Sequence, residues 1–124
     1  MNKSKVYFTD LRAPVGTSQL TKLQRLIRSA GIGEIDMEKK LVAIKLHFGE
    51  PGNLTYLRPN YAKAVADVVK ELGGVPFLTD CNTLYPGRRK NALEHIESAY
   101  ENGFPPSPPA VRSSLETACG AMMT

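Results

Sequence analysis

Lys45 and His47 stand two residues apart near the end of an alternating apolar run, and their side chains are suited to acid–base chemistry. Residues two apart on a β-strand share one face of the sheet, so the ammonium and the imidazole are expected side by side. Polar groups in a buried strand need partners. The pair indicates either a site, or a strand end where Lys45 extends to water and His47 binds a loop carbonyl.

Further polar residues follow the ends of apolar runs. Two runs end in the same dipeptide, Thr-Asp, at Asp10 and Asp80. In an open parallel α/β sheet, ligands bind beyond the carboxyl ends of the strands, so two carboxylates are expected at one rim. The candidate catalytic residues are Lys45, His47 and Asp80. The candidate ligand-binding residues are Asp10, Arg12, Gly49, Glu50, Arg58, Asn82, Thr83 and Tyr85.

Several of these residues also have an ordinary structural explanation. The sequence "GEPGN" at 49–53 is a common turn sequence, and no glycine-rich phosphate-binding fingerprint accompanies it. Loop carboxylates are more often turn and cap residues than metal ligands, so no metal site is expected. Cys81 is expected to be a small buried thiol and His95 a packing residue on a helix.

Three apolar runs alternate with three helical patterns. Strands are predicted over 5–10, 41–48 and 74–82, and helices over 17–32, 58–74 and 88–103, the last with Leu93, Ile96 and Tyr100 facing inward. Strands linked by such helices run parallel through right-handed crossovers. The predicted class is α/β: a three-layer Rossmann-like fragment with a small parallel sheet in the order β-α-β-α-β-α.

The end of the sequence does not continue this pattern. Residues 105–109 contain four prolines, and the small residues after them lack the pattern of a strand. We expect an α/β domain over 1–104 and an irregular tail over 105–124 that forms no paired strand. A three-stranded sheet would then keep two free edges, so we expect a dimer or other homo-oligomer, an aggregation-prone monomer, or tail residues that cover the edge.

Composition narrows the classes of partner. The net charge is +4, with 42% hydrophobic and 23% charged residues, as in an ordinary globular protein. Basic residues are scattered among acidic ones, so nucleic-acid binding is not expected, and no apolar run suits a membrane span or a signal peptide. The two cysteines favour a cytoplasmic setting and are too few for an iron–sulfur cluster, so no cofactor is expected in this chain.

The run from Val6 to Phe104 resembles a known family. The residues that carry the resemblance are "KVYFTDLRA", "VAIKLHFGEPGN", "YLRPNY", "KELGGVPFLTDCNTLYPGRR" and "NALEHIESAYENGF". The family is domain of unknown function 362, described as Fe–S center proteins, for which no reaction is established. Many longer members carry ferredoxin-type cysteine runs after this region, so the resemblance implies a [4Fe-4S] center in full-length relatives, outside this chain.

The tail departs from the family pattern, in which a fourth strand follows the third helix. A one-base shift of the codons for 110–124 permits nearly the expected segment. Our hypothesis is that the tail "AVRSSLETACGAMMT" is a frameshift product.

Three functions remain open. The first is the N-terminal domain of a ferredoxin-like Fe–S protein that binds a small anionic ligand or docks a redox domain. The second is a stand-alone Rossmann-like enzyme, with Lys45 or His47 as acid or base and Asp10 or Asp80 orienting it. The third is a protein-interaction module that uses a free sheet edge.

Overall fold

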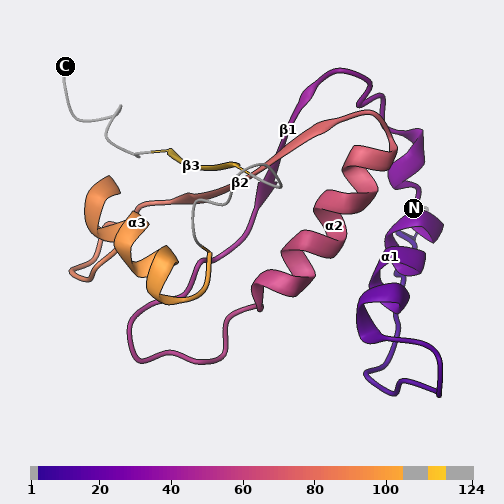
Figure 1. Ribbon diagram of the computed structural model, residues 1–124, viewed down its shortest axis with the longest axis horizontal. Helices are drawn as coiled ribbons and strands as arrows, with labels where there is room; N and C mark the ends of the chain where they lie inside the picture. Colours follow the sequence, from indigo (N-terminus) through magenta and orange to yellow (C-terminus); the bar gives the residue numbers. More distant parts are fainter. Residues whose placement is uncertain (1–2, 105–111, 117–124) are drawn as a thin grey trace.

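The computed structural model describes residues 3–104 and 112–116. Its elements are α1 (Gln19–Ser29), the short 3-10 helix η1 (Ile32–Glu34), β1 (Leu41–Lys45), α2 (Pro59–Glu71), β2 (Val75–Cys81), α3 (Ala92–Glu101) and β3 (Arg112–Glu116), as Figure 1 shows. The strands form one parallel sheet in the order β1-β2-β3. The predicted α/β class is confirmed.

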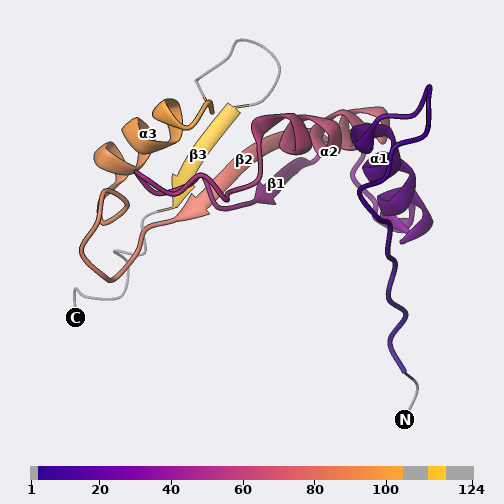
Figure 2. The ribbon, with the colours of Figure 1, turned by 90° about the horizontal axis from the view of Figure 1, so that it is seen from below.

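The helices cover the sheet unevenly. α2 packs against β2 and β1, α3 packs against β3, and α1 packs mainly against α2. Because both connections between strands move in the same direction across the sheet, right-handed crossovers place α2 and α3 on one face, as Figure 2 shows. The described residues therefore build two layers where three were expected.

The helix ends follow the local sequence signals. The Ser18 side chain accepts a hydrogen bond from Thr21 N at the start of α1, and the Asn91 side chain accepts one from Glu94 N at the start of α3. Pro59 occupies the first position of α2, where its missing N–H removes no helical bond. Each helix is followed by a glycine with positive φ: Gly31, Gly73 and Gly103.

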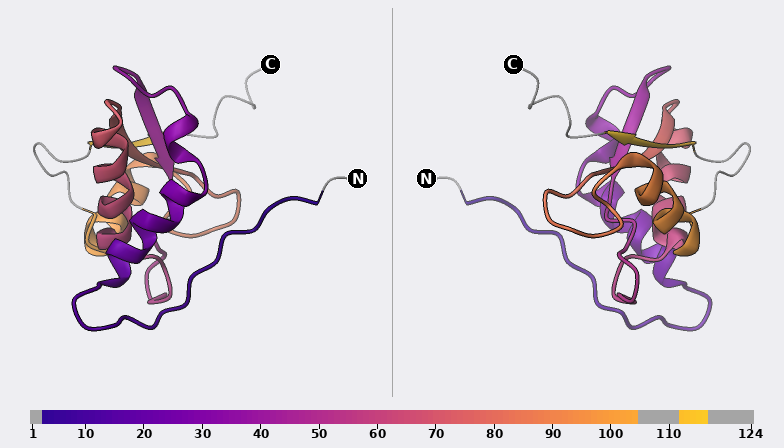
Figure 3. Two further views of the ribbon diagram at one scale, coloured as in Figure 1. Left: turned by 90° about the vertical axis from the view of Figure 1, so that its right-hand side faces the viewer. Right: turned by 90° about the vertical axis from the view of Figure 1, so that its left-hand side faces the viewer.

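The first predicted strand, over residues 5–10, is wrong. Residues 3–10 form no strand and lead away from the helices and the sheet in Figure 3. Lys22 Nζ binds the Asp10 carboxylate at 2.5 Å and the carbonyl oxygens of Asp10 and Arg12 at 2.8 and 2.7 Å. These bonds hold the end of the segment against α1. Alternating apolar residues favour a strand, but a strand forms only where its backbone finds a partner.

The prediction that no strand follows the prolines is also wrong. Arg112–Glu116 pair in parallel with Phe77–Cys81 of β2. An edge strand tolerates a polar sequence because its backbone supplies the ladder bonds. The frameshift hypothesis rested partly on the expected absence of a strand after the third helix, and this pairing removes that argument. The remaining tail residues, 105–111 and 117–124, lie outside the described residues.

The buried face of α3 differs from the predicted one. Leu93 and Tyr100 are 76% and 41% exposed. The side chains that α3 buries are those of His95, Ser98 and Ala99. The helix is therefore turned so that a polar side chain, His95, enters the core.

The core lies at the carboxyl end of β1 and β2. Phe48 is completely buried, and its ring lies 5.1 Å from that of Phe104 between centroids. Ala62 from α2, Leu78 from β2 and Ala99 from α3 complete the cluster. Small residues on the helices allow them to lie close to the sheet.

β1 is shorter than the predicted strand over 41–48. The ladder continues only to Leu46, whose N–H donates to Thr79 O at 3.1 Å. Phe48 N then donates to the Asp80 carboxylate at 3.2 Å, and Gly49 turns the chain with a φ of +93°. A side-chain acceptor thus replaces the sheet as partner of the backbone.

Replacing Gly49 by alanine is expected to destabilise the fold by about 2–4 kcal/mol, because positive φ strain adds to overpacking. A Cβ atom at Gly49 would lie 2.5 Å from Asn102 Nδ2 and 2.8 Å from Tyr56 Cδ1. Gly52 is the matched control: its φ is +84°, but a Cβ there meets nothing within 4 Å. Gly52→Ala should cost about 1 kcal/mol in urea unfolding. Equal losses would contradict the close packing at Gly49.

Candidate functional site

The Asp80 carboxylate, near the end of β2, is the centre of a buried polar cluster. Its side chain is 2% exposed. Oδ1 accepts hydrogen bonds from Lys45 Nζ at 3.0 Å and Cys81 N at 2.8 Å, and Oδ2 accepts one from Phe48 N at 3.2 Å. Burial raises the pKa of Asp80, but these donors outweigh it, and the pKa lies below its ordinary value. Asp80 is therefore charged at neutral pH.

His95, from the first half of α3, is the second member of the cluster. Its ring is completely buried, with Nε2 3.2 Å from Asp80 Oδ2 and Nδ1 3.0 Å from Asn82 Oδ1. Burial lowers the pKa of His95, and the attraction of Asp80 offsets only part of that effect. The ring is therefore neutral at pH 7 and carries one N–H.

A neutral ring donates one hydrogen bond and accepts one. Asp80 accepts only, so the proton belongs on Nε2, and Nδ1 needs a donor. Asn82 Nδ2 is buried and has no partner among the described residues. An Asn82 amide with its nitrogen turned toward Nδ1 satisfies both groups, and we assign that arrangement.

Arg89 and Glu50 form the third part of the cluster. The Arg89 side chain is 6% exposed, and its Nε donates to Glu50 Oε2 at 2.5 Å. Arg89 Nη2 donates to the Tyr85 hydroxyl at 2.6 Å, and Nη1 lies 3.6 Å from Asp80 Oδ2. The hydrogen bond from Arg89 lowers the pKa of Glu50. These contacts join the loop after β1 to the loop after β2.

The structure brings together part of the predicted site. Lys45, Glu50, Asp80, Asn82 and Tyr85 belong to the cluster through the contacts above. Thr83 lies beside it, since its N–H donates to Arg89 O at 2.9 Å.

His47 and Gly49 are joined by a hydrogen bond of their own. Gly49 N donates to His47 Nδ1 at 2.8 Å, and the His47 side chain is exposed. The imidazole nitrogen nearest the chain is thus used within a local turn. Lys45 pairs with Asp80, and no contact joins Lys45 to His47 among the described residues.

Three predicted residues lie away from the cluster. Asp10 and Arg12 bind Lys22 beside α1, so the premise that two strands deliver Asp10 and Asp80 to one rim is wrong. Arg58 is exposed just before the first turn of α2.

Neither His95 nor Arg89 is among the predicted site residues. Arg89 was one of three basic residues before a helix, which is the pattern of a solvated helix start. His95 stood between Leu93 and Ile96, on what looked like the apolar face. The cap at Asn91 fixes where α3 begins but not which face it buries, so no local signal singled out His95. The prediction of a buried thiol was wrong as well, because Cys81 is exposed.

The polar cluster around Asp80 does not have the ligands of a metal or iron–sulfur site. Within residues 3–104 and 112–116, no three His, Cys, Asp or Glu side chains are grouped as metal ligands. An iron–sulfur cluster needs four thiolate ligands, and the chain has two cysteines, so its residues do not fit the [4Fe-4S] center that the family resemblance implies for full-length relatives. In the described part of the chain, no helix has the length and apolar character needed to cross a membrane.

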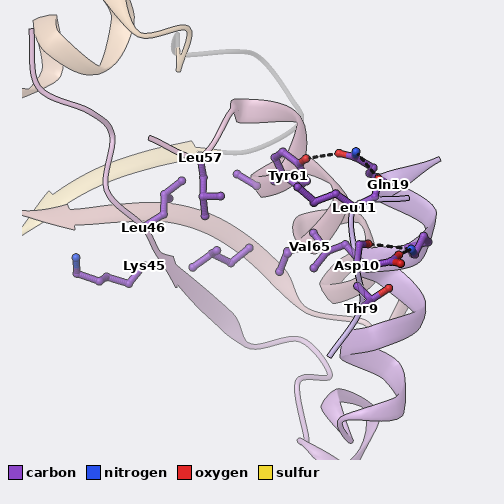
Figure 4. Close-up of a pocket in the computed structure, with 13 residues that line it drawn as sticks. Thr9, Asp10, Leu11, Gln19, Lys45, Leu46, Leu57, Tyr61 and Val65 are labelled. Atoms are coloured by element: carbon purple, nitrogen blue, oxygen red, sulfur yellow. Dashed lines mark hydrogen bonds and ion pairs between the residues drawn. The ribbon is translucent and has the colours of Figure 1, made fainter. Parts of the chain in front are cut away.

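A cavity of about 370 Å³ lies between β1, α1 and α2. Figure 4 shows side chains from β1, the start of α2, α1 and the segment before α1 around it. Its lining residues are Thr9, Asp10, Leu11, Gln19, Lys22, Leu23, Ile44, Lys45, Leu46, Leu57, Tyr61, Ala62 and Val65. Most are apolar, so the cavity suits an apolar group.

The polar residues around this cavity already have partners. Lys22 binds Asp10, and the Tyr61 hydroxyl donates to Gln19 Oε1 at 2.7 Å. Lys45 contributes its aliphatic stem, while its ammonium group points away from the other lining residues in Figure 4 and binds Asp80. The surface that faces the interior of the cavity is therefore mainly apolar.

A family model described as Domain of unknown function (DUF362) matches residues 42–111, more than half of the chain. The chain belongs to this family. The match spans the part of the DUF362 chain that holds Lys45, Glu50, Asp80, Arg89 and His95, and it leaves out the segment that holds Asp10. No curated protein and no solved structure matches the chain.

Acidification from pH 7.5 to 5.5 is expected to destabilise the DUF362 chain through His95. Because its folded pKa is lowered, the unfolded chain binds the proton first, so stability is full above the ordinary pKa near 6.5 and declines as the pH falls. Uptake of one proton changes the free energy of unfolding by at most about 1.4 kcal/mol per pH unit. Urea unfolding at each pH measures it.

The chain's two histidines provide the control. His95→Gln should remove the decline, whereas His47→Gln should keep it. A decline that persists in His95→Gln would show that other groups cause it.

Proposed function

We propose that this DUF362 domain is a docking module whose β1 edge accepts an extended apolar polypeptide segment as an additional strand. The observation that carries the proposal is the free edge of β1 beside the apolar cavity. Within the described ranges, β1 pairs with β2 alone. Addition of a strand to a free edge is a recurrent mode of peptide recognition.

The hydrogen-bond pattern supports a free edge with unused donors. Lys40 O accepts from Val75 N at 2.8 Å, and Leu46 N donates to Thr79 O at 3.1 Å. In a parallel ladder, alternate residues of a strand bond to the same neighbour, so residues 40, 42, 44 and 46 face β2. The backbone groups of Leu41, Ala43 and Lys45 then face outward, where a further strand would bind them.

The cavity supports an apolar occupant at the same place. It adjoins Ile44 and Leu46 of the β1 region and lies under residues of α1 and α2. No residue of α1 is buried, so its apolar side has room to pack against further chain. A strand added to β1 would direct alternate side chains into this space. Burial of each such side chain contributes roughly 1.5–3 kcal/mol.

The charges favour docking over the other two functions. In the polar cluster each cation already faces a carboxylate, Lys45 with Asp80 and Arg89 with Glu50, so a small anion would compete with these ion pairs. The enzyme alternative used Lys45 or His47 as acid or base, but Lys45 is paired with Asp80, and His47 Nδ1 accepts from Gly49 N. A docking role also agrees with the hypothesis that the domain docks a redox partner.

A tryptophan in the cavity tests this function. The chain has no tryptophan, so Leu57→Trp introduces a single reporter at a cavity residue that is 61% exposed. The probes are a synthetic peptide of alternating valine and threonine, the same peptide with proline at every second position, and citrate, phosphate and adenosine monophosphate. We expect a saturable blue shift of emission with the first peptide alone.

Leu54→Trp is the control, since Leu54 is 87% exposed and does not line the cavity. Its emission should not respond to any probe. A response of Leu57→Trp to the small anions but not to the alternating peptide would overturn the docking function in favour of ligand binding.

A further inference from the structure

We propose that the segment docking on β1 is the N-terminal arm (residues 3–9) of a second copy of this chain, so that two copies exchange arms. This inference rests on the proposed function and names the partner of the same edge. It concerns residues 5–9 of the arm, which would pair with Leu41–Lys45. Two features of the molecule lead to it: what the arm exposes, and where its root is held.

The arm exposes apolar side chains with the period of a strand. Val6 and Phe8 are 89% and 84% exposed, and Tyr7 between them is 44% exposed. Alternate residues of a strand point to opposite faces, so Val6 and Phe8 belong together. Two large apolar side chains in water on an extended segment are costly, and burial against another surface removes that cost.

The root of the arm is bonded to α1, across the cavity from its own β1. The three hydrogen bonds from Lys22 Nζ fix Asp10 and Arg12 against α1. From there the arm leads away from the rest of the molecule in Figures 2 and 3. The side chain of Lys22 is 18% exposed and that of Asp10 is 50% exposed, so this anchor is partly shielded from water. The arm is thereby presented to another molecule.

The arm and the edge match in length and in chemistry. β1 has five residues, equal in number to residues 5–9, and such a strand spans about 17 Å. The donors of Leu41, Ala43 and Lys45 would bind the arm's backbone, and Val6 and Phe8 would occupy the apolar cavity. Each copy offers one arm and one edge. A reciprocal exchange therefore closes as a two-fold dimer and leaves no β1 edge free.

A single tryptophan in the arm reports its docking. Phe8→Trp in the full chain should show blue-shifted emission when the protein is concentrated. Dilution should shift the emission to that of a water-exposed indole, over the range in which light scattering records dimer becoming monomer. Val15→Trp is the control, because Val15 is fully exposed and outside the arm, so its emission should stay that of exposed indole throughout.

Two pairs of variants test separately the roles of the arm and of the β1 edge in dimer formation. Phe8→Asp places a charge in the cavity, and Val15→Asp adds the same charge elsewhere. Ala43→Pro removes an outward donor of β1, and Ala43→Thr retains it. Phe8→Asp and Ala43→Pro should each be monomeric, with circular dichroism confirming the fold, while the two controls dimerise. Mixed together, the two monomeric variants should form a heterodimer through one intact arm and one intact edge.

The outcomes distinguish this inference from the proposed function. A monomer with concentration-independent blue emission from Phe8→Trp would show that the arm docks on its own chain and would overturn the exchange. A dimer that persists in Phe8→Asp would show that the copies associate through another interface, and this would also overturn the exchange. In either case, a peptide response of Leu57→Trp combined with Phe8→Asp, whose arm cannot occupy the cavity, would leave the docking function standing, and loss of that response would remove both.

Discussion

The buried carboxylate of Asp80 is the constraint on which the rest of the structure depends. A charge removed from water is tolerated only when donors surround it, and here they come from β1 and the loop after it, from β2 and from α3. The N–H of Phe48 ends the β1 ladder, and the ring of His95 sets the rotation of α3. Removing one partner of such a buried pair typically costs about 3–5 kcal/mol. The cluster therefore holds the carboxyl end of the sheet in one arrangement.

Because the ion pairs of the polar cluster are made within the molecule, we look for the functional surface at the free edge of β1. Lys45 forms an ion pair with Asp80, and Arg89 forms one with Glu50, so the positive and negative charges of the polar cluster largely balance. Its contribution is to fix β1 at the point where the chain leaves the sheet. The unused hydrogen-bonding capacity lies on the opposite side of that strand, beside an apolar cavity. A rigid edge next to a cavity is a favourable surface for docking an extended segment.

The sequence predicts what local chemistry decides. Ser18, Pro59 and Asn91 mark the helix starts because each acts within its own turn. Strands depend on partners, so the alternation of residues 5–10 predicted a strand that lacks a neighbour, and the polar residues 112–116 formed one because β2 had a free edge. The same limit applies to α3: apolar spacing favoured Leu93 inside, but the buried charge of Asp80 required His95.

Hydrogen exchange at the amides of β1 tests the docking edge most directly. In a dilute sample, resolved by NMR, the amides of Val42 and Ile44 should be protected by β2, while those of Leu41, Ala43 and Lys45 exchange as free donors. In a concentrated sample the second set should become protected, since the added strand binds it. Equal protection of both sets at every concentration, or no gain for the second set on concentration, would contradict the account.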